Sequence, residues 1–385
     1  MQKILLFIAS LFYFNFLFSK NEIKSWQGIH ETPLSRLEQQ FAEPPVEFAN
    51  HVIWGWEGKM DKKTICNDLD SIKKKGFRAV IFEAGYKLPF KYLSEEWFKA
   101  IRTGVVEAKK RDMKVWIIDE GKYPSGFAGG KFSQERPDLR MQALVIGDTI
   151  QIKRGEVMTN HKIAPEIISA VAVSTSGAPN RTVEINNGKI SFNAGLDDWK
   201  ILLVKSDFRT AVTRAVNNPN GGKDATNSLC DYLNPVAVQQ FIDWTHKQYK
   251  KYLGKELGTT VLGFRGDEPD YAHLPWTPSI VQTFKDTKGY DPTPYLASFF
   301  TASPTIQEQR VKADYWDVWS SLFATHFFKL QADWCAANGV AHITHLNKEH
   351  EMPACVKAEG DYFRALSKVQ IPGVDAIWNQ IWPST

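Results

Sequence analysis

The sequence predicts an α/β fold, a (β/α)₈ TIM-type barrel that is truncated after about six strands and carries a β-rich inserted domain. Three observations predict it. Short apolar runs alternate with amphipathic helical segments, which is typical of parallel strands joined by crossover helices. Most of these runs end in or near acidic residues. Between residues 138 and 216 the helical pattern is replaced by short β-branched runs and turn signals such as Asn186-Asn187-Gly188.

The strands of the barrel are predicted from apolar runs that are too short for helices. A closed barrel of this type needs eight strands, so the pattern indicates either a barrel that lacks two units or an open sheet. We favour truncation and expect the chain to be the N-terminal part of a longer enzyme that is poorly stable by itself. The predicted strands are residues 51–55, 78–82, 114–118, 261–264, 340–344 and 374–378.

Helix boundaries are marked by capping residues. Asp61 and Ser94 each precede an amphipathic segment, and Asn234 is followed by proline at the first helical position. A long aromatic helix is predicted over about residues 306–338, just before the strand at 340–344.

The chain is predicted to divide into five segments. The β-rich segment is expected to be one small antiparallel domain whose strands do not join the barrel sheet. The segments are a signal peptide (1–19), an N-terminal leader (20–48), the first part of the catalytic barrel (49–137), the β-rich insertion (138–216), and the continuation of the barrel, C-terminally incomplete (217–385).

The N-terminus has the layout of a secretory signal peptide. Lys3 precedes a largely apolar run from Ile4 to Phe18, which is short for a membrane span and is followed by polar sequence. Leu17 is bulky for the position two residues before a cut after Ser19, so a retained anchor is the alternative. We expect an exported protein, periplasmic, cell-surface or secreted, without stable membrane insertion after cleavage.

Composition excludes some classes of partner. The net charge is +4, and no basic run interleaved with aromatic residues points to nucleic acid. The 13 Trp, 12 Tyr and 24 Phe suit a large core and a cleft that stacks on sugar rings. The four cysteines form no C-x-x-C pair, which argues against a zinc site; disulfides and buried apolar roles both stay open.

The most informative stretch is Val261–Tyr271. An apolar run leads directly into Asp267, Glu268 and Asp270, with a turn at Pro269. Such a run predicts a buried parallel strand, whose carboxyl end is where α/β folds place their chemistry. Crowded carboxylates favour a protonated one, so Glu268 is the candidate general acid. The alternatives are that Asp267 fills this role, or that both only cap a solvated turn.

Glu349 is the candidate general base because it follows a predicted strand. A base that activates water has to stand roughly 6.5–9.5 Å from the acid. Lys348 and His350 flank Glu349 and are compatible with a mere surface charge. A base located beyond residue 385 is the other alternative.

Further residues are candidates for binding the sugar. The aromatic ones are equally compatible with core positions, and the acidic ones with salt bridges or with a hard cation such as calcium. His342 and His345, three apart on a strand, point to opposite faces and so do not form a metal pair. The candidates are Trp54, Trp56, Tyr123, Trp276, Trp378, Glu83, Asp119, Glu120, Asp267, His345 and Asn347.

Four motifs carry a resemblance to a known family: His51–Gly58, Asp119–Gly126, Gly266–Pro269 and Gly289–Leu296. Together they resemble the α-L-rhamnosidase family of glycoside hydrolases (family 106) and its uncharacterised relatives, over residues 48–385. The resemblance implies a (β/α)₈ barrel, inverting hydrolysis by a pair of glutamates, and a calcium ion near the substrate. By strand order Glu268 ends the fourth strand, where related barrel glycosidases carry their acid. Members are usually much longer, which supports truncation.

These observations predict an exported glycoside hydrolase that cleaves poly- or oligosaccharides by a two-carboxylate acid/base mechanism, with α-L-rhamnosidase activity implied by the resemblance. Two alternatives stay open. One is a catalytically inactive, carbohydrate-binding fragment of a longer enzyme. The other is a metal-dependent hydrolase that uses His and Asp residues.

Overall fold

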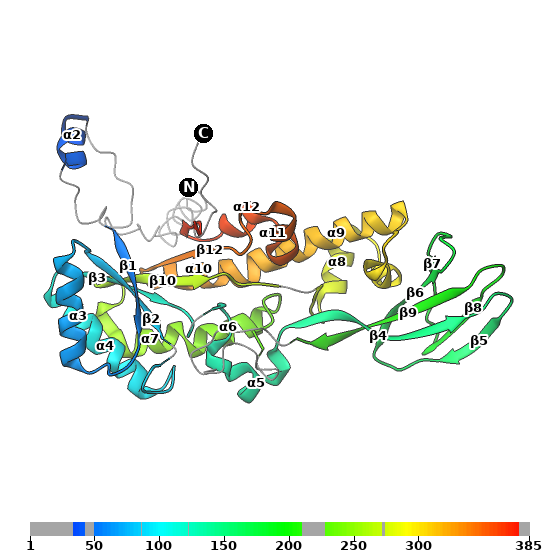
Figure 1. The fold of residues 1–385 in the computed structure, drawn as a ribbon, viewed down its shortest axis with the longest axis horizontal. Helices are drawn as coiled ribbons and strands as arrows, with labels where there is room; N and C mark the ends of the chain where they lie inside the picture. The colour runs from blue at the N-terminus through cyan, green and yellow to red at the C-terminus, as the bar shows by residue number, and fades with distance from the viewer. Residues whose placement is uncertain are drawn as a thin grey trace, which may run out of the picture.

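The computed structural model describes residues 34–42, 50–85, 87–121, 123–209, 228–271 and 274–376. The molecule is elongated, with a parallel sheet and most helices toward one end and antiparallel strands at the other (Figure 1). The predicted signal peptide and most of the leader lie outside the described residues; α2 (Leu34–Ala42) belongs to the leader.

The parallel sheet has six strands, and their order across the sheet is the same as their order along the chain. All of its pairings are parallel, as the alternating pattern predicts. The order is β1 (His51–Trp56), β2 (Ala79–Ala84), β3 (Lys114–Ile118), β10 (Val261–Asp267), β12 (Ala341–His345) and β13 (Ile371–Pro372).

The structure confirms five predicted strands to within a few residues and corrects the sixth. The last strand is Ile371–Pro372, whereas residues 374–376 are not in a strand and 377–378 lie outside the described part. The six parallel strands do not close into a barrel within the described residues. Within the described residues β1 and β13 each have one neighbour in the sheet, because six strands do not complete the circle that eight would close. Two free edges are compatible with both alternatives that the sequence left, a barrel that lacks two units and an open sheet.

The helices begin where the capping residues predict. Asp61 accepts the Thr64 N–H at 2.9 Å at the start of α3 (Lys62–Lys74), and Ser94 accepts the Trp97 N–H at 3.3 Å at the start of α4 (Glu95–Lys110). Asn234 caps α6 (Pro235–Trp244), which α7 (His246–Leu253) follows. Apart from the long aromatic helix, the other α-helices of the described residues are α5 (Lys131–Glu135), α8 (Ile280–Lys288), α11 (Met352–Glu359) and α12 (Tyr362–Leu366).

The long aromatic helix is present but contains a π-helical turn. It consists of α9 (Ile306–Leu322), the π-helical residues Phe323–Phe328 and α10 (Lys329–Ala337). Thr305 and Glu308 form a reciprocal capping box at its start.

The two faces of the parallel sheet are covered differently. One face packs Trp56, Val80 and Phe82 against apolar side chains of α3, α4 and α7. The other holds a small cluster of Trp116, Leu262 and Ala341. This one-sided layer of helices is typical of a barrel wall, and it leaves the second face free to carry polar side chains near the carboxyl ends of the strands.

The residues of the β-rich segment form two antiparallel sheets. Five strands are ordered β11 (Pro275–Trp276), β4 (Gln142–Ile152), β9 (Trp199–Phe208), β6 (Ile167–Ser174) and β7 (Arg181–Thr182), and β5 (Val157–Lys162) pairs with β8 (Lys189–Asn193). None of the strands between residues 142 and 208 enters the parallel sheet.

This lobe has a hydrophobic cluster of its own around Trp199 and Ile201, and it also packs against the rest of the chain. β11 joins its sheet from outside the segment, and Leu144 and Val204 lie in the same hydrophobic core as Tyr315 and Trp319 of α9. The lobe is therefore packed onto the rest of the chain.

The four cysteines are free thiols, and three of them are buried. Among the described residues no helix combines the length and apolar character needed to cross a bilayer.

Candidate active site

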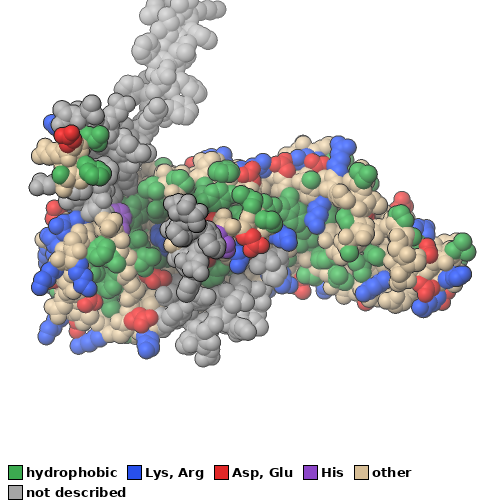
Figure 2. Space-filling view, turned by 45° about the horizontal axis from the view of Figure 1, so that its top comes forward, with side chains coloured by type: hydrophobic (Ala, Val, Ile, Leu, Met, Phe, Trp, Pro, Cys, Tyr) green, Lys and Arg blue, Asp and Glu red, His purple; other side chains and the backbone are tan. Residues whose placement is uncertain are grey.

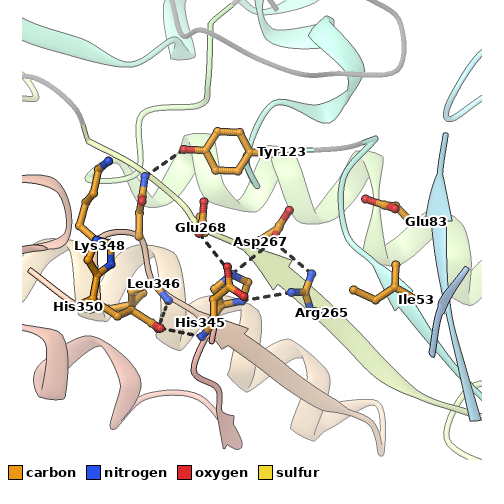
Figure 3. A pocket seen from close by; sticks show the side chains of 13 residues that line it. Ile53, Glu83, Tyr123, Arg265, Asp267, Glu268, His345, Leu346, Lys348 and His350 are labelled. Atoms are coloured by element: carbon orange, nitrogen blue, oxygen red, sulfur yellow. Dashed lines mark hydrogen bonds and ion pairs between the residues drawn. The ribbon is translucent and has the colours of Figure 1, made fainter. Parts of the chain in front are cut away.

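A pocket of about 590 Å³ opens at the carboxyl ends of the parallel strands (Figure 3). Figure 2 shows acidic and histidine side chains together on the face that carries it, with apolar side chains beside them. The pocket is large enough for one or more sugar rings. Its lining residues are Ile53, Glu83, Tyr123, Arg265, Asp267, Glu268, His345, Leu346, Asn347, Lys348, Glu349, His350 and Asp375.

Glu268 stands directly after β10 and lines the pocket. Its backbone is left-handed, with φ of 36°, a conformation that costs a non-glycine residue about 1–3 kcal/mol. Its side chain is 22% exposed, and Oε1 lies 3.7 Å from Nε2 of His345. The strained backbone turns this carboxyl to the pocket, where it is accessible to a ligand.

A charged layer lies beside Glu268. Strand alternation places Arg265 and Asp267 on one face of β10, and His345 is in register with Asp267 on β12. Arg265 forms an ion pair with Asp267 (Nη1 to Oδ1, 3.2 Å) and lies 3.3 Å from Nδ1 of His345 through Nη2. His345 Nε2 is 3.6 Å from Asp267 Oδ1. The arginine therefore orients both an acid and an imidazole beside Glu268.

Ligand atoms of Glu268, His345 and Asp375 lie within 4.8 Å of one another and are the candidate metal group in the described part of the chain. Calcium prefers six to eight oxygen ligands, whereas this group offers two carboxylates and an imidazole. The nearby Arg265 guanidinium also opposes a cation. This set does not fit the calcium ion that the resemblance implies, and no step is derived through one.

Asn347 connects two carboxylates and a phenol. Its side-chain amide donates to the Tyr123 hydroxyl at 3.0 Å and to Asp270 Oδ2 at 3.2 Å, and its backbone N–H donates to Glu359 Oε1 at 3.0 Å. Burial and the charge of Asp270 raise the pKa of Tyr123. The predicted sugar-binding residues Tyr123 and Asn347 are thus brought together at the pocket wall.

Glu359 is a residue that the sequence analysis missed. It is buried at the end of α11, and its Oε2 has no hydrogen-bond partner among the described residues. Burial, followed by the charge of Asp270, raises its pKa well above the ordinary value. Its one local signal is a place at the end of a helix before Gly360, and only the tertiary fold brings it next to Asn347.

Glu349 lines the pocket as predicted, but it also ties two loops together. Oε1 accepts the Leu346 N–H at 2.9 Å, and Oε2 accepts the Asp375 N–H at 2.7 Å. Each carboxylate oxygen has a second lone pair, so both contacts leave acceptor capacity for a water.

Glu83 also lines the pocket, whereas three tryptophans do not. Trp54 and Trp56 follow the strand alternation to the helix-covered face of the sheet, while Ile53 between them faces the pocket. Trp276 is buried in the core beside the antiparallel sheet. Trp378 lies outside the described residues.

The structure does not bring Asp119 or Glu120 to the pocket wall, because the chain folds over both and neither is exposed. Burial raises the pKa of Asp119 to about 7 and that of Glu120 to about 8. Glu120 accepts backbone N–H groups of Gly121 (2.7 Å), Gly129 (3.0 Å) and Ala128. The two carboxyls organise the loop after β3.

A carboxylate-rich pocket at the carboxyl ends of parallel strands is characteristic of barrel-type glycoside hydrolases. A sequence profile of the alpha-L-rhamnosidase family, glycoside hydrolase family 106, matches residues 156–381, more than half of the chain. The chain belongs to this family.

Two further similarities accompany the family match. A protein of Formosa agariphila, described as "Putative beta-glucuronidase", is 23% identical over 360 residues, which cover 80% of this chain and 30% of that protein. The structure of a rhamnosidase from Novosphingobium sp. PP1Y superimposes with a TM-score of 0.59 at 14% identity, over 86% of this chain and 48% of the other. At this identity the second likeness shows the fold alone. The chain spans about a third to a half of the length of these two proteins.

Proposed function

We propose that this chain carries the acid-bearing site of a glycoside hydrolase that cleaves α-L-rhamnosides. The observation that carries the proposal is Glu268, a partly exposed glutamate on a strained backbone at the carboxyl end of a buried parallel strand, inside a pocket of about 590 Å³. Family membership supports the glycosidase class, and the rhamnosidase fold agrees with it.

Glu268 donates a proton to the departing glycosidic oxygen in this mechanism. His345, held by Arg265 and Asp267, lies 3.7 Å from Glu268 Oε1 and keeps the carboxyl directed at the pocket. A proton delivered as the glycosidic bond breaks avoids a charged sugar leaving group, which contributes typically about 10²–10⁴-fold in rate.

The second carboxylate is Glu349, which accepts a proton from the attacking water. It lines the same pocket, and its two backbone contacts fix its position. Glu349→Gln should lower turnover by about 10²-fold or more, whereas Glu351→Gln, an exposed glutamate two residues away, should have no effect. Equal activity of the two variants would remove Glu349 from the mechanism.

The substrate is a poly- or oligosaccharide. A second hollow of about 930 Å³ shares Lys348 with the pocket and is lined by aromatic side chains such as Phe299, Phe300 and Trp316. Aromatic faces beside a sugar site suit stacking on further rings. The two hollows together have room for more than one residue of a glycan.

A second candidate activity is hydrolysis of a glucuronide. Arg265 and Lys348 place two cations in the pocket wall, which suit a sugar carboxylate, and the Formosa relative carries that description. The test is the release of 4-nitrophenol from the α-L-rhamnoside and from the β-D-glucuronide. Cleavage of the rhamnoside alone supports the first proposal, cleavage of the glucuronide alone supports the second, and binding of glycans without cleavage of either supports a carbohydrate-binding fragment.

We also propose that the protein is exported, on the apolar run after Lys3 that lies outside the described residues. Expression of the full chain followed by cell fractionation and N-terminal sequencing tests this. Mature protein that begins near residue 20 outside the cytoplasm is expected; an intact Met1 terminus in the cytoplasm would contradict it.

A further inference from the structure

The backbone just before Glu268 is held at two points by one buried serine. The Asp267 N–H donates to Ser125 Oγ at 2.7 Å, and the Ser125 N–H donates to the Asp267 carbonyl at 2.9 Å. Both backbone polar groups of Asp267 are therefore bonded to Ser125. The next residue along the chain is Glu268 with its positive φ.

Ser125 is itself fixed on every polar group. Its hydroxyl donates to Asp119 Oδ1 at 2.6 Å, and its carbonyl accepts the Tyr232 hydroxyl. Ser125 and Asp119 are both fully enclosed, and Gly126 has φ of 100°, where a Cβ would come within 2.4 Å of the Tyr232 ring. This packing leaves the serine no alternative position.

Asp119 anchors the assembly in the sheet. Its backbone N–H donates to the Arg265 carbonyl at 3.0 Å. This hydrogen bond joins the end of β3 to β10, two residues before Asp267. Asp119 and Ser125 belong to the loop after β3, so two neighbouring strand ends are linked through them. None of the Ser125 or Asp119 atoms lines the pocket.

We propose that Ser125, supported by Asp119, is a positioning residue that holds the Glu268 carboxyl where it donates its proton. The inference rests on the function proposed above. A left-handed backbone at a glutamate persists only when the surrounding structure holds it in place. The two hydrogen bonds between Ser125 and the Asp267 backbone supply that constraint. Without the Ser125 hydroxyl, the Asp267 amide and Asp119 each lose a buried partner, and the strand end relaxes.

The test compares two substrates that differ in their need for an acid. An α-L-rhamnosyl disaccharide needs its leaving oxygen protonated, whereas 2,4-dinitrophenyl α-L-rhamnoside does not. We expect Ser125→Ala to lower kcat on the disaccharide by about 10²-fold, the usual effect of a 1 Å misplacement, with KM little changed. The dinitrophenyl substrate should lose less than about threefold.

Ser298→Ala is the matched control, because that buried hydroxyl donates to the Tyr295 carbonyl at 2.6 Å, away from the pocket lining. If Ser125→Ala does not fold, Ser125→Cys carries the same measurement, since sulfur is a weaker partner of nearly the same shape. Equal loss on both substrates, or a loss no larger than that of Ser298→Ala, overturns the positioning role. Glu268→Gln measured alongside separates the two proposals: if it shows no preference between substrates, the proposed function fails; if it does and the Ser125 variant does not, only this inference fails.

Discussion

Carboxyl groups around the pocket differ in their surroundings, and the difference determines what each can do. Glu268 is partly exposed beside an imidazole and lines the pocket, so a ligand there can reach it. Glu359 is fully buried, and its pKa is raised well above 4.5, first by burial and then by the charge of Asp270. It stays protonated at pH values at which an exposed glutamate is ionised.

Glu359 therefore predicts a pH dependence of stability. The folded state keeps this proton to higher pH than the unfolded chain, whose ordinary pKa is 4.5. Its contribution is fully present below that value and is lost as the pH rises toward the folded pKa. Glu359→Gln should make the free energy of unfolding fall less between pH 5 and 8, by at most about 1.4 kcal/mol per pH unit. Chemical denaturation across that range measures it, with exposed Glu351→Gln as the control. Parallel pH profiles for wild type and Glu359→Gln would contradict the prediction.

At the scale of the element, β10 is shaped by close contact with its neighbours. Its pairing with β3 shifts between Val261 and Gly263, and a Cβ at Gly263 would lie 1.9 Å from the Ala341 carbonyl oxygen. Because of this irregularity, Leu262 packs with Trp116 and Ala341 on one face of the sheet, while Phe264 packs on the helix-covered face. Arg265 and Asp267 then point toward the pocket. Gly263 therefore matters for the site even though it does not contact it.

Gly263→Ala should destabilise the protein by about 1–3 kcal/mol or more, because the backbone of β12 has to move. The matched control is Gly55→Ala on β1, where the added Cβ would meet its nearest neighbour, Glu83 Oε2, at an ordinary 3.5 Å. Thermal unfolding of both variants measures the difference. Equal melting temperatures for the two would show that β10 and β12 are not held as closely as described.

Most elements of the parallel sheet could be predicted, because their apolar runs, caps and acidic ends are local signals. The last strand could not be predicted, because Ile371–Pro372 is too short to give a periodic pattern. The longer apolar run at 374–378 gives a stronger strand signal in the sequence. The site was predicted where residues follow strand ends, as for Glu268, Glu83 and His345. It was missed at Glu359 and Ser125, whose places depend on chain segments far away in sequence.

At the scale of the whole molecule, the antiparallel lobe and several helices pack together in one hydrophobic core. The hydrophobic core that includes Val204 of β9 also contains Phe241 of α6 and Trp319 of α9. Because the lobe and these helices share one core, they should unfold together. Sequence patterns alone separated them, because they showed the change in periodicity but not the packing across the boundary.

Val204→Ala should lower the stability of the whole chain by about 1–3 kcal/mol, with a single transition retained. The residue is fully buried in that shared core, whereas Val157 on β5 is 63% exposed and Val157→Ala should change stability by less than about 0.5 kcal/mol. Differential scanning calorimetry distinguishes the outcomes. Two separate transitions, of which Val204→Ala lowers only one, would mean that the lobe folds independently.

The central claim is that the pocket at the end of the parallel sheet cleaves a glycosidic bond with Glu268 as its acid. The most direct measurement is the turnover of an α-L-rhamnosyl disaccharide by the wild-type chain and by Glu268→Gln, with the melting temperature of both recorded. We expect hydrolysis by the wild type and a loss of about 10²–10⁴-fold in the variant at unchanged stability. A folded Glu268→Gln protein that hydrolyses the disaccharide at the wild-type rate would contradict it.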